Sequence, residues 1–89
     1  MSRESYLNHP TFGLLYQVCE VTANQDLFAT LYAQRLFFLV TASPEGLQFE
    51  PIGRSDARIL LENRLRGLRR NGSETEYMAL QLVYKQTFQ

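Results

Sequence analysis

The chain has 89 residues and no net formal charge, and 45% of its residues are apolar. This length allows one domain, or one small domain with an appendage, and excludes a deep cleft between two domains. The balanced charge argues against a general attraction to nucleic acids or membranes. Residues 1–52 nevertheless carry two basic against five acidic residues, a net −3, and residues 53–89 carry seven against four, a net +3. The two segments are therefore suited to attract each other or different partners.

Cys19 is the only cysteine of the chain, so no intramolecular disulfide can form. It lies in an apolar, strand-like run, and we expect a plain buried thiol rather than a reactive one. Residues 1–8 are polar and mixed in charge, unlike a signal peptide. The longest apolar run, Leu36 to Val40, is far too short to span a bilayer. We therefore expect a soluble, cytoplasmic protein.

Short runs of apolar residues separated by breakers predict β-strands in the first half of the chain. We expect a short edge strand over 5–8 that ends before Pro10, because proline cannot donate to a central ladder. A longer strand is expected over 13–21, with Leu15, Cys19 and Val21 on one face and Leu14, Tyr16 and Val18 on the other. Turns are expected over 22–26 and 41–46, and a closing strand over 47–52.

Residues 27–40 form the most apolar stretch and predict a β-hairpin whose loop is Ala33-Gln34, which would place Ala29 opposite Phe38. The loop lacks the Gly or Asn that a tight turn prefers, which leaves a slip of this register open. The expected faces are Leu27, Ala29, Leu31, Leu36, Phe38 and Val40, and Phe28, Thr30, Tyr32, Arg35, Phe37 and Leu39. Because both are apolar, one should fill a small barrel and the other needs a cover from the chain's own helices or from a partner.

The apolar period becomes helical at Gly53, which divides the chain into a barrel over 1–53 and two helices within 54–89. The helices are expected at about 55–70, with Ser55 as N-cap and Asn71-Gly72 as the end, and at about 73–88, with a capping box from Ser73 to Glu76. Their expected core stripes are Ala57, Leu60, Leu61, Leu65 and Leu68, and Tyr77, Leu80, Val83, Tyr84 and Phe88. The predicted fold is α+β, a small Tudor-like or SH3-like β-barrel followed by a C-terminal two-helix hairpin.

Residues with catalytic or metal-binding chemistry are few. His9 lies beside a proline without a carboxylate or cysteine at ligand spacing, so a turn role is favoured over a metal role. Glu50 and Glu62 have no evident acid–base companion, and Glu62 is instead expected to pair with Arg66 four residues later. One His and one Cys do not assemble a nucleophile–base pair. We therefore predict a protein that is not an enzyme and holds no metal or cofactor.

Two segments are candidates for binding. The hairpin tip combines an aromatic residue with an arginine, as binding hot spots do, although an ordinary exposed hairpin end remains the alternative; its residues are Tyr32, Gln34 and Arg35. The first helix is rich in arginine near its C-terminus, where cations suit the helix dipole; these residues are Arg64, Arg66, Arg69 and Arg70. This helix presents either a solvated face or a patch for DNA phosphates or an acidic protein surface.

Four long runs of the sequence resemble the PipX family, the PII-interacting proteins of cyanobacteria. They are Tyr6 to Tyr16 (YLNHPTFGLLY), Leu27 to Thr41 (LFATLYAQRLFFLVT), Phe49 to Arg54 (FEPIGR) and the closing QTF at 86–88. The resemblance covers nearly the whole chain. It departs from the family around 22–23 and 42–46 and in parts of both helices.

The resemblance implies a Tudor-like domain with two helices and a role in nitrogen regulation of transcription. At low 2-oxoglutarate, the T-loops of the PII signal protein trimer would hold the protein. At high 2-oxoglutarate it would be released and would bind the NtcA dimer as a coactivator. The effectors 2-oxoglutarate, ATP and ADP would act on the partners. Further candidate partners are PlmA, joined through PII, and RNA polymerase, approached by the C-terminal helices.

The family's contact positions match nine residues here: Tyr6, Phe12, Leu14, Tyr16, Tyr32, Gln34, Arg35, Leu36 and Phe38. Since the surfaces for PII and NtcA overlap, their binding would be mutually exclusive. Leu36 and Phe38 are either contacts or barrel core. This interpretation expects a monomer in the free state, without direct DNA or membrane binding. The alternatives are an autonomous nucleic-acid-binding module that uses the arginine-rich helix, and a structural subunit of a larger complex.

Overall fold

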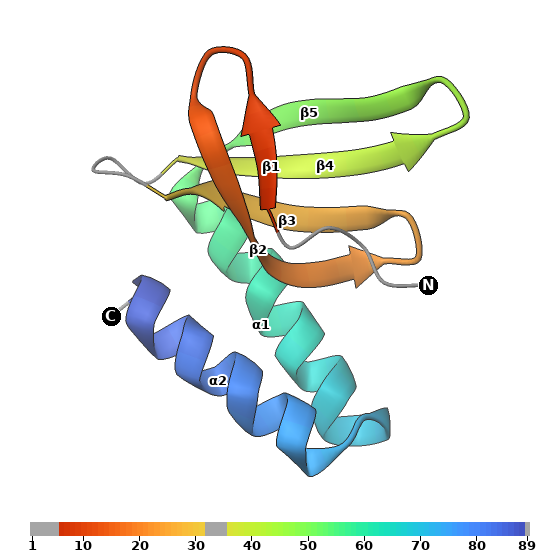
Figure 1. Ribbon diagram of the computed structural model, residues 1–89. Coiled ribbons are helices and arrows are strands. Elements are labelled where there is room, and N and C mark those ends of the chain that lie inside the picture. The colour runs from red at the N-terminus through yellow and green to blue at the C-terminus, as the bar shows by residue number, and fades with distance from the viewer. Residues whose placement is uncertain (1–5, 32–35, 89) are drawn as a thin grey trace.

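The computed structural model of the chain describes residues 6–31 and 36–88. In chain order its elements are β1 (Tyr6–His9), β2 (Gly13–Thr22), β3 (Gln25–Thr30), β4 (Phe37–Ser43), β5 (Gly46–Ile52), α1 (Arg54–Asn71) and α2 (Glu74–Phe88). The strands form one antiparallel sheet in sequence order, and they curl into a half-barrel against which the helix pair lies (Figure 1). The predicted α+β fold, a small barrel followed by a two-helix hairpin, is confirmed.

Three short turns join the strands where the sequence predicted breaks. In the β1–β2 turn, Nδ1 of His9 accepts hydrogen bonds from the backbone N–H groups of Thr11 (3.0 Å) and Phe12 (3.2 Å), which confirms the turn role of this histidine. Gly13 follows with a φ of 77°, and Gly46, at the start of β5, has a φ of 122°. Both conformations favour glycine, because a Cβ would strain the backbone there.

The register between β3 and β4 differs by one residue from the predicted hairpin. Ala29 lies opposite Phe37, and Phe28 lies opposite Phe38. Thr30 fixes this register, because its backbone N–H donates to the carbonyl of Leu36 (2.9 Å) and its hydroxyl accepts from the N–H of Leu36 (2.9 Å). The predicted pairing of Ala29 with Phe38 is therefore wrong, and every β4 side chain lies on the face opposite to the predicted one. The predicted loop pair, 33–34, lies outside the described residues.

An irregularity in β2 corrects a second prediction. Its pairing with β3 shifts between Gln17 and Cys19, so that one additional residue, Val18, is accommodated on the β2 side. A bulge of this kind reverses the alternation of side chains beyond it. Leu15 and Cys19 were expected on one face, but Leu15 packs with the barrel interior whereas Val18 and Cys19 both face the helices.

The sheet has a buried core on each of its two faces. The interior of the half-barrel buries Leu15, Phe28, Phe38 and Val40, with Leu7 and Phe49 at its margin. The other core joins strands and helices and includes Cys19, Leu27, Ala29, Phe37, Ala57, Leu61, Leu68, Leu80 and Phe88. The expectation that one face of the hairpin fills a barrel and the other needs a cover is thus confirmed, and the cover is the chain's own helix pair.

The ends of the helices agree with the sequence except at the first N-cap. The N-cap of α1 is Gly53, which makes no side-chain capping bond, and its carbonyl accepts from the N–H of Ala57 (2.9 Å). Ser55 lies inside the helix, so the N-cap assigned to it is wrong. Gly72 ends α1 by donating its N–H to the carbonyl of Leu68 (2.8 Å). The capping box of α2 is confirmed, because the N–H of Glu76 donates to Oγ of Ser73 (3.0 Å) and Oε1 of Glu76 accepts from the N–H of Ser73 (3.4 Å).

Polar contacts between α1 and α2 involve a carboxylate that was expected to pair elsewhere. Glu62 pairs with Arg58, not with Arg66: its Oε2 accepts from Nε of Arg58 (3.2 Å) and from the hydroxyl of Tyr84 (2.6 Å). The same Nε also donates to the Tyr84 hydroxyl oxygen (2.9 Å). The guanidinium of Arg66 donates to Asn63 instead. Tyr84 therefore ties α2 to an ion pair on α1.

Candidate functional site

Six of the nine residues matched to the family's contacts lie in the described part of the chain. They are Tyr6, Phe12, Leu14, Tyr16, Leu36 and Phe38. The other three, Tyr32, Gln34 and Arg35, lie outside the described residues. The six belong to the β1–β2 hairpin and to the start of β4. They therefore lie on the barrel part of the fold and not on the helices.

Tyr6, Leu14 and Tyr16 share the face of the sheet against which the helices pack. Tyr6 lies opposite Tyr16, which in turn lies opposite Ala29 of the helix-facing core. Tyr16 is half-buried against that core, whereas Tyr6 at the sheet edge is 55% exposed. In the next row, the carbonyl of Leu14 accepts from the N–H of Leu31 (3.1 Å), which places these two residues side by side. An apolar surface thus extends from the covered core to the edge of the sheet.

Phe12 and Phe38 belong to an aromatic cluster at the β1–β2 turn. The His9 ring lies 5.1 Å from the ring of Phe12 and 5.5 Å from that of Phe38, and those two phenyl rings are 5.2 Å apart. Phe12 is exposed, but Phe38 is only 2% exposed and belongs to the barrel core. Phe38 consequently supports Phe12 and offers almost no contact area of its own.

Leu36 is exposed and lies just before β4, opposite the end of β3. Together with Leu14 and Leu31 it marks the end of the sheet where β2 begins and β3 ends. We call the exposed or half-buried apolar residues on both faces of this end the apolar rim: Tyr6, Phe12, Leu14, Tyr16, Leu31 and Leu36. Leu31 was not among the matched positions; the sequence placed it only on the same hairpin face as Leu27 and Ala29.

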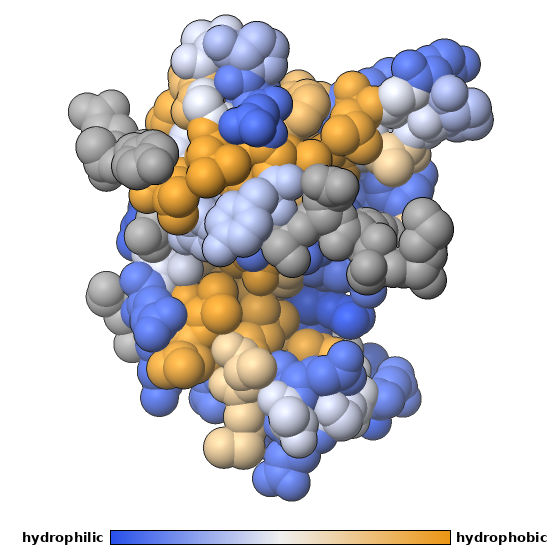
Figure 2. Space-filling view, in the orientation of Figure 1, coloured by the Kyte–Doolittle hydropathy of each residue, from blue (hydrophilic) through white to orange (hydrophobic). Residues whose placement is uncertain are grey.

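Figure 2 shows apolar surface gathered across the sheet, with a separate apolar area over the helix pair. Exposed aromatic and aliphatic side chains on a folded sheet are typical of protein-binding surfaces. The described residues contain no group of three or more His, Cys, Asp or Glu arranged to hold a metal ion. Burial raises the pKa of the Cys19 thiol to about 12, so this sulfur is a protonated core group and the expectation of a plain buried thiol is confirmed. The arrangement is suited to recognise another protein.

A family model described as PipX, PII-interacting protein X, matches residues 3–88. The chain belongs to the PipX family. A comparison with curated proteins finds no match. Among the described residues, the PipX fold of this chain contains no helix long and apolar enough to cross a membrane. Membership of the family makes this a PII-interacting protein, and the apolar rim is its candidate contact surface.

Proposed function

We propose that this PipX-family protein is a non-enzymatic transcriptional coactivator of NtcA in the cytoplasm. In this proposal, the T-loops of the PII trimer hold it when 2-oxoglutarate is scarce. When 2-oxoglutarate is abundant, it moves to the NtcA dimer and favours the active conformation of that regulator. The observation that carries the proposal is the apolar rim on the barrel of a PII-interacting fold, where Tyr6, Phe12 and Leu31 are exposed.

The rim suits a site that two proteins share. Tyr6 and Phe12 provide rigid aromatic area at low conformational cost. Phe12 is supported from below by His9 and the buried Phe38, so its ring is held before binding. If PII and NtcA both cover this surface, only one can bind at a time. The switch then requires no ligand on this chain, because the effectors change the affinities of PII and NtcA for it, and these affinities decide which of the two binds.

The alternative of an autonomous nucleic-acid-binding module receives less support from the arginine-rich helix. Four arginines of α1 make contacts inside the protein: Arg54 with the carbonyl of Thr87, Arg58 with Glu62, Arg64 with Glu20 and Arg66 with Asn63. The carboxylates of Glu62 and Glu20 partly offset the charges of Arg58 and Arg64, and the chain carries no net charge overall, which disfavours autonomous binding to DNA phosphates. We expect no direct DNA binding and no membrane binding, and PlmA through PII and RNA polymerase at the helices remain further candidate partners.

Binding to PII tests the proposal, measured by calorimetry first with ADP and then with ATP plus 2-oxoglutarate. We expect tight binding in ADP that is lost with 2-oxoglutarate. Leu31→Ala and Tyr32→Ala should each weaken the ADP complex about tenfold or more, as loss of a buried interface anchor does.

Leu82→Ala is a matched control for Leu31→Ala, because Leu82 is a similarly exposed leucine (57% against 43%) on α2, away from the rim. It should leave PII affinity unchanged. Binding that ignored the effector would indicate a fixed structural subunit and contradict the shuttle. Equal losses from Leu31→Ala and Leu82→Ala would show that the rim is not the contact surface.

A further inference from the structure

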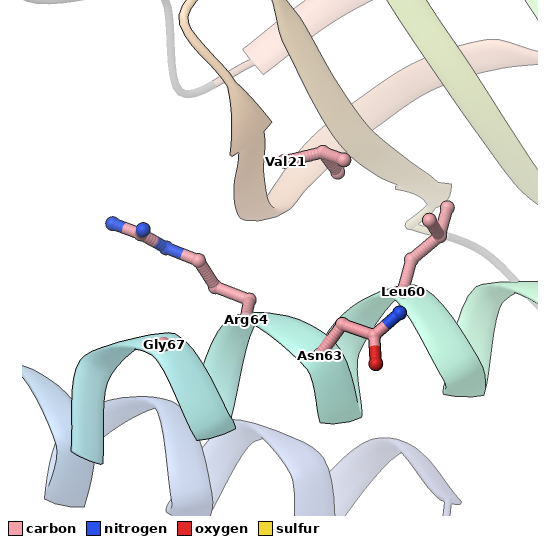
Figure 3. A pocket seen from close by; sticks show the side chains of 5 residues that line it. All are labelled: Val21, Leu60, Asn63, Arg64 and Gly67. Atoms are coloured by element: carbon pink, nitrogen blue, oxygen red, sulfur yellow. The ribbon is translucent and has the colours of Figure 1, made fainter. Parts of the chain in front are cut away.

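A pocket of about 290 Å³ lies between the end of β2 and the middle of α1. Its lining residues are Val21, Leu60, Asn63, Arg64 and Gly67. In Figure 3 the Val21 side chain lies on the strand side, and the other four residues follow one another along α1. The pocket thus combines apolar walls from Val21 and Leu60 with an amide and a guanidinium.

Gly67 is the first indication that this pocket receives something from outside. It lies inside the 18-residue helix α1, where glycine is about the least favourable residue after proline. A Cβ added to Gly67 would meet no atom within 4 Å, so no internal packing explains the missing side chain. A glycine that lowers helix stability without an internal reason, and that lines a pocket, is suited to the close approach of a partner's backbone.

The pairing of Arg64 is the second indication. Its Nη2 lies 3.6 Å from Oε1 of Glu20, and the Glu20 side chain is about half exposed. A pair this long and this exposed contributes little to folding. It does show that a carboxylate fits beside Arg64, one of the residues that line the pocket. Arg70, one turn beyond Gly67 along the same helix and exposed, adds positive charge to this side of α1.

We propose that this pocket is a docking site for an acidic peptide segment of a partner protein. A carboxylate of the segment takes the place of Glu20 on Arg64, an adjacent apolar side chain packs against Val21 and Leu60, and the peptide backbone passes over Gly67. Apolar walls around a single arginine favour a carboxylate with an apolar neighbour over the evenly spaced phosphates of a nucleic acid.

This site goes beyond the proposed function, because it lies away from the apolar rim. Tyr16 is the rim residue of β2 nearest to the pocket, and Val21 lies five residues further along the strand, at most about 17 Å away if the strand were fully extended. A partner in the pocket can therefore bind while PII or NtcA covers the rim. An experiment can therefore contradict the peptide site in the pocket without contradicting the proposed binding of PII and NtcA at the rim, and the reverse.

The test follows backbone amide shifts of the ¹⁵N-labelled full chain during titration with the peptide acetyl-Gly-Glu-Leu-Glu-Leu-Glu-Gly-amide. The same peptide with Gln in place of each Glu is the control probe. We expect shifts centred on Val21, Arg64 and Gly67 with the acidic peptide and none with the Gln peptide. Removing the competing carboxylate in Glu20→Gln should strengthen binding up to about fivefold, the worth of an exposed ion pair.

Arg64→Gln should weaken peptide binding about tenfold or more, because the bound carboxylate loses its charged partner. Arg69→Gln makes the same charge change on the same helix but outside this pocket, and should alter binding about twofold at most. Gly67→Leu should block the peptide. Gly67→Ala should raise the melting temperature by about 4 °C or more, since it fits the open space and favours the helix.

Four outcomes overturn the proposal, the last of them a change in PII binding. The first is the absence of pocket shifts at every soluble peptide concentration. The second is equal weakening by Arg64→Gln and Arg69→Gln, which would indicate diffuse charge attraction. The third is a DNA duplex that shifts the pocket amides when the peptide does not, which would assign the pocket to nucleic acid. PII binding, measured in parallel, should be unchanged by Arg64→Gln; its loss would place the pocket within the PII surface and also overturn a separate site.

Discussion

Cys19 is a single residue whose chemistry is decided by its surroundings. It is nearly fully buried between β2 and the helices, and burial is the largest cause that raises its pKa from 9.0 to about 12. Thiolate is therefore scarce in the folded protein at neutral pH. We expect iodoacetamide to modify the native chain far more slowly than the denatured chain, and mass spectrometry after timed quenching measures the ratio. Modification at equal rates would contradict the buried position.

The same residue predicts a loss of stability in alkaline solution. Between pH 9.0 and about 12 the unfolded chain releases the thiol proton while the folded chain keeps it, so the folded state binds more protons. The free energy of unfolding should then fall as the pH rises through this window, and no such effect from Cys19 is expected below it. Cys19→Ala removes the titrating group, and urea melts along a pH series should show a shallower alkaline decline than in the wild type. An identical decline in both proteins would assign the effect to other groups.

At the scale of elements, the sequence predicted the strands and helices correctly, because each follows from a pattern of many residues. It failed for features that a single local contact determines. Alternation and breakers predicted the strands, and helical spacing predicted both core stripes, because these depend on many residues together. The β3–β4 register depends instead on the two hydrogen bonds of Thr30 with Leu36, which no periodicity reveals. The bulge at Val18 and the glycine N-cap of α1 are likewise local choices. Of the candidate site, the family resemblance named Tyr6, Phe12 and Phe38, and the sequence left open whether Phe38 is a contact or barrel core. Only the folded structure shows that Tyr6 and Phe12 are exposed and that Phe38 is buried.

The helix pair gives a prediction at the same scale. The hydroxyl of Tyr84 is the largest cause that lowers the pKa of Glu62, and Arg58 adds to it. Because the pKa of Glu62 is lower in the folded chain, its carboxylate stabilises the folded state at pH values above 4.5, the ordinary pKa of Glu. This stabilisation is lost as the pH falls below that value. Tyr84→Phe should therefore cause a modest destabilisation at neutral pH that becomes smaller in acid, as measured by thermal melts.

Tyr77→Phe is the matched control for Tyr84→Phe, since Tyr77 packs on the same core from the same helix. It should melt with the wild-type dependence on pH. If Tyr84→Phe and Tyr77→Phe showed the same curve, the hydroxyl of Tyr84 would not contribute through Glu62.

For the whole molecule, the helix-facing core makes sheet and helices depend on each other. Phe37 of β4 stacks on Phe88 of α2 at 5.5 Å between ring centroids, and Arg54 at the start of α1 donates to the carbonyl of Thr87 (3.1 Å) and lies over the Phe88 ring. The C-terminal end of α2 therefore packs against β4 and against the start of α1. Removal of the helices would expose Leu27, Ala29 and Phe37, so the apolar rim depends on a sheet that the helices complete.

Leu61 tests this dependence, because it is fully buried in the core that the sheet shares with both helices. Leu61→Ala should lower the free energy of unfolding by about 3 kcal/mol, the cost of a buried cavity. Leu82→Ala, on the exposed face of α2, should change it by about 0.5 kcal/mol at most. Native-state hydrogen exchange separates the parts: in Leu61→Ala the slowest amides of β3 and of α1 should lose protection by the same amount, because both exchange through one cooperative unfolding. Loss of protection in α1 with β3 unchanged would show that the barrel folds by itself, and the helices would then be an appendage to the rim rather than its support.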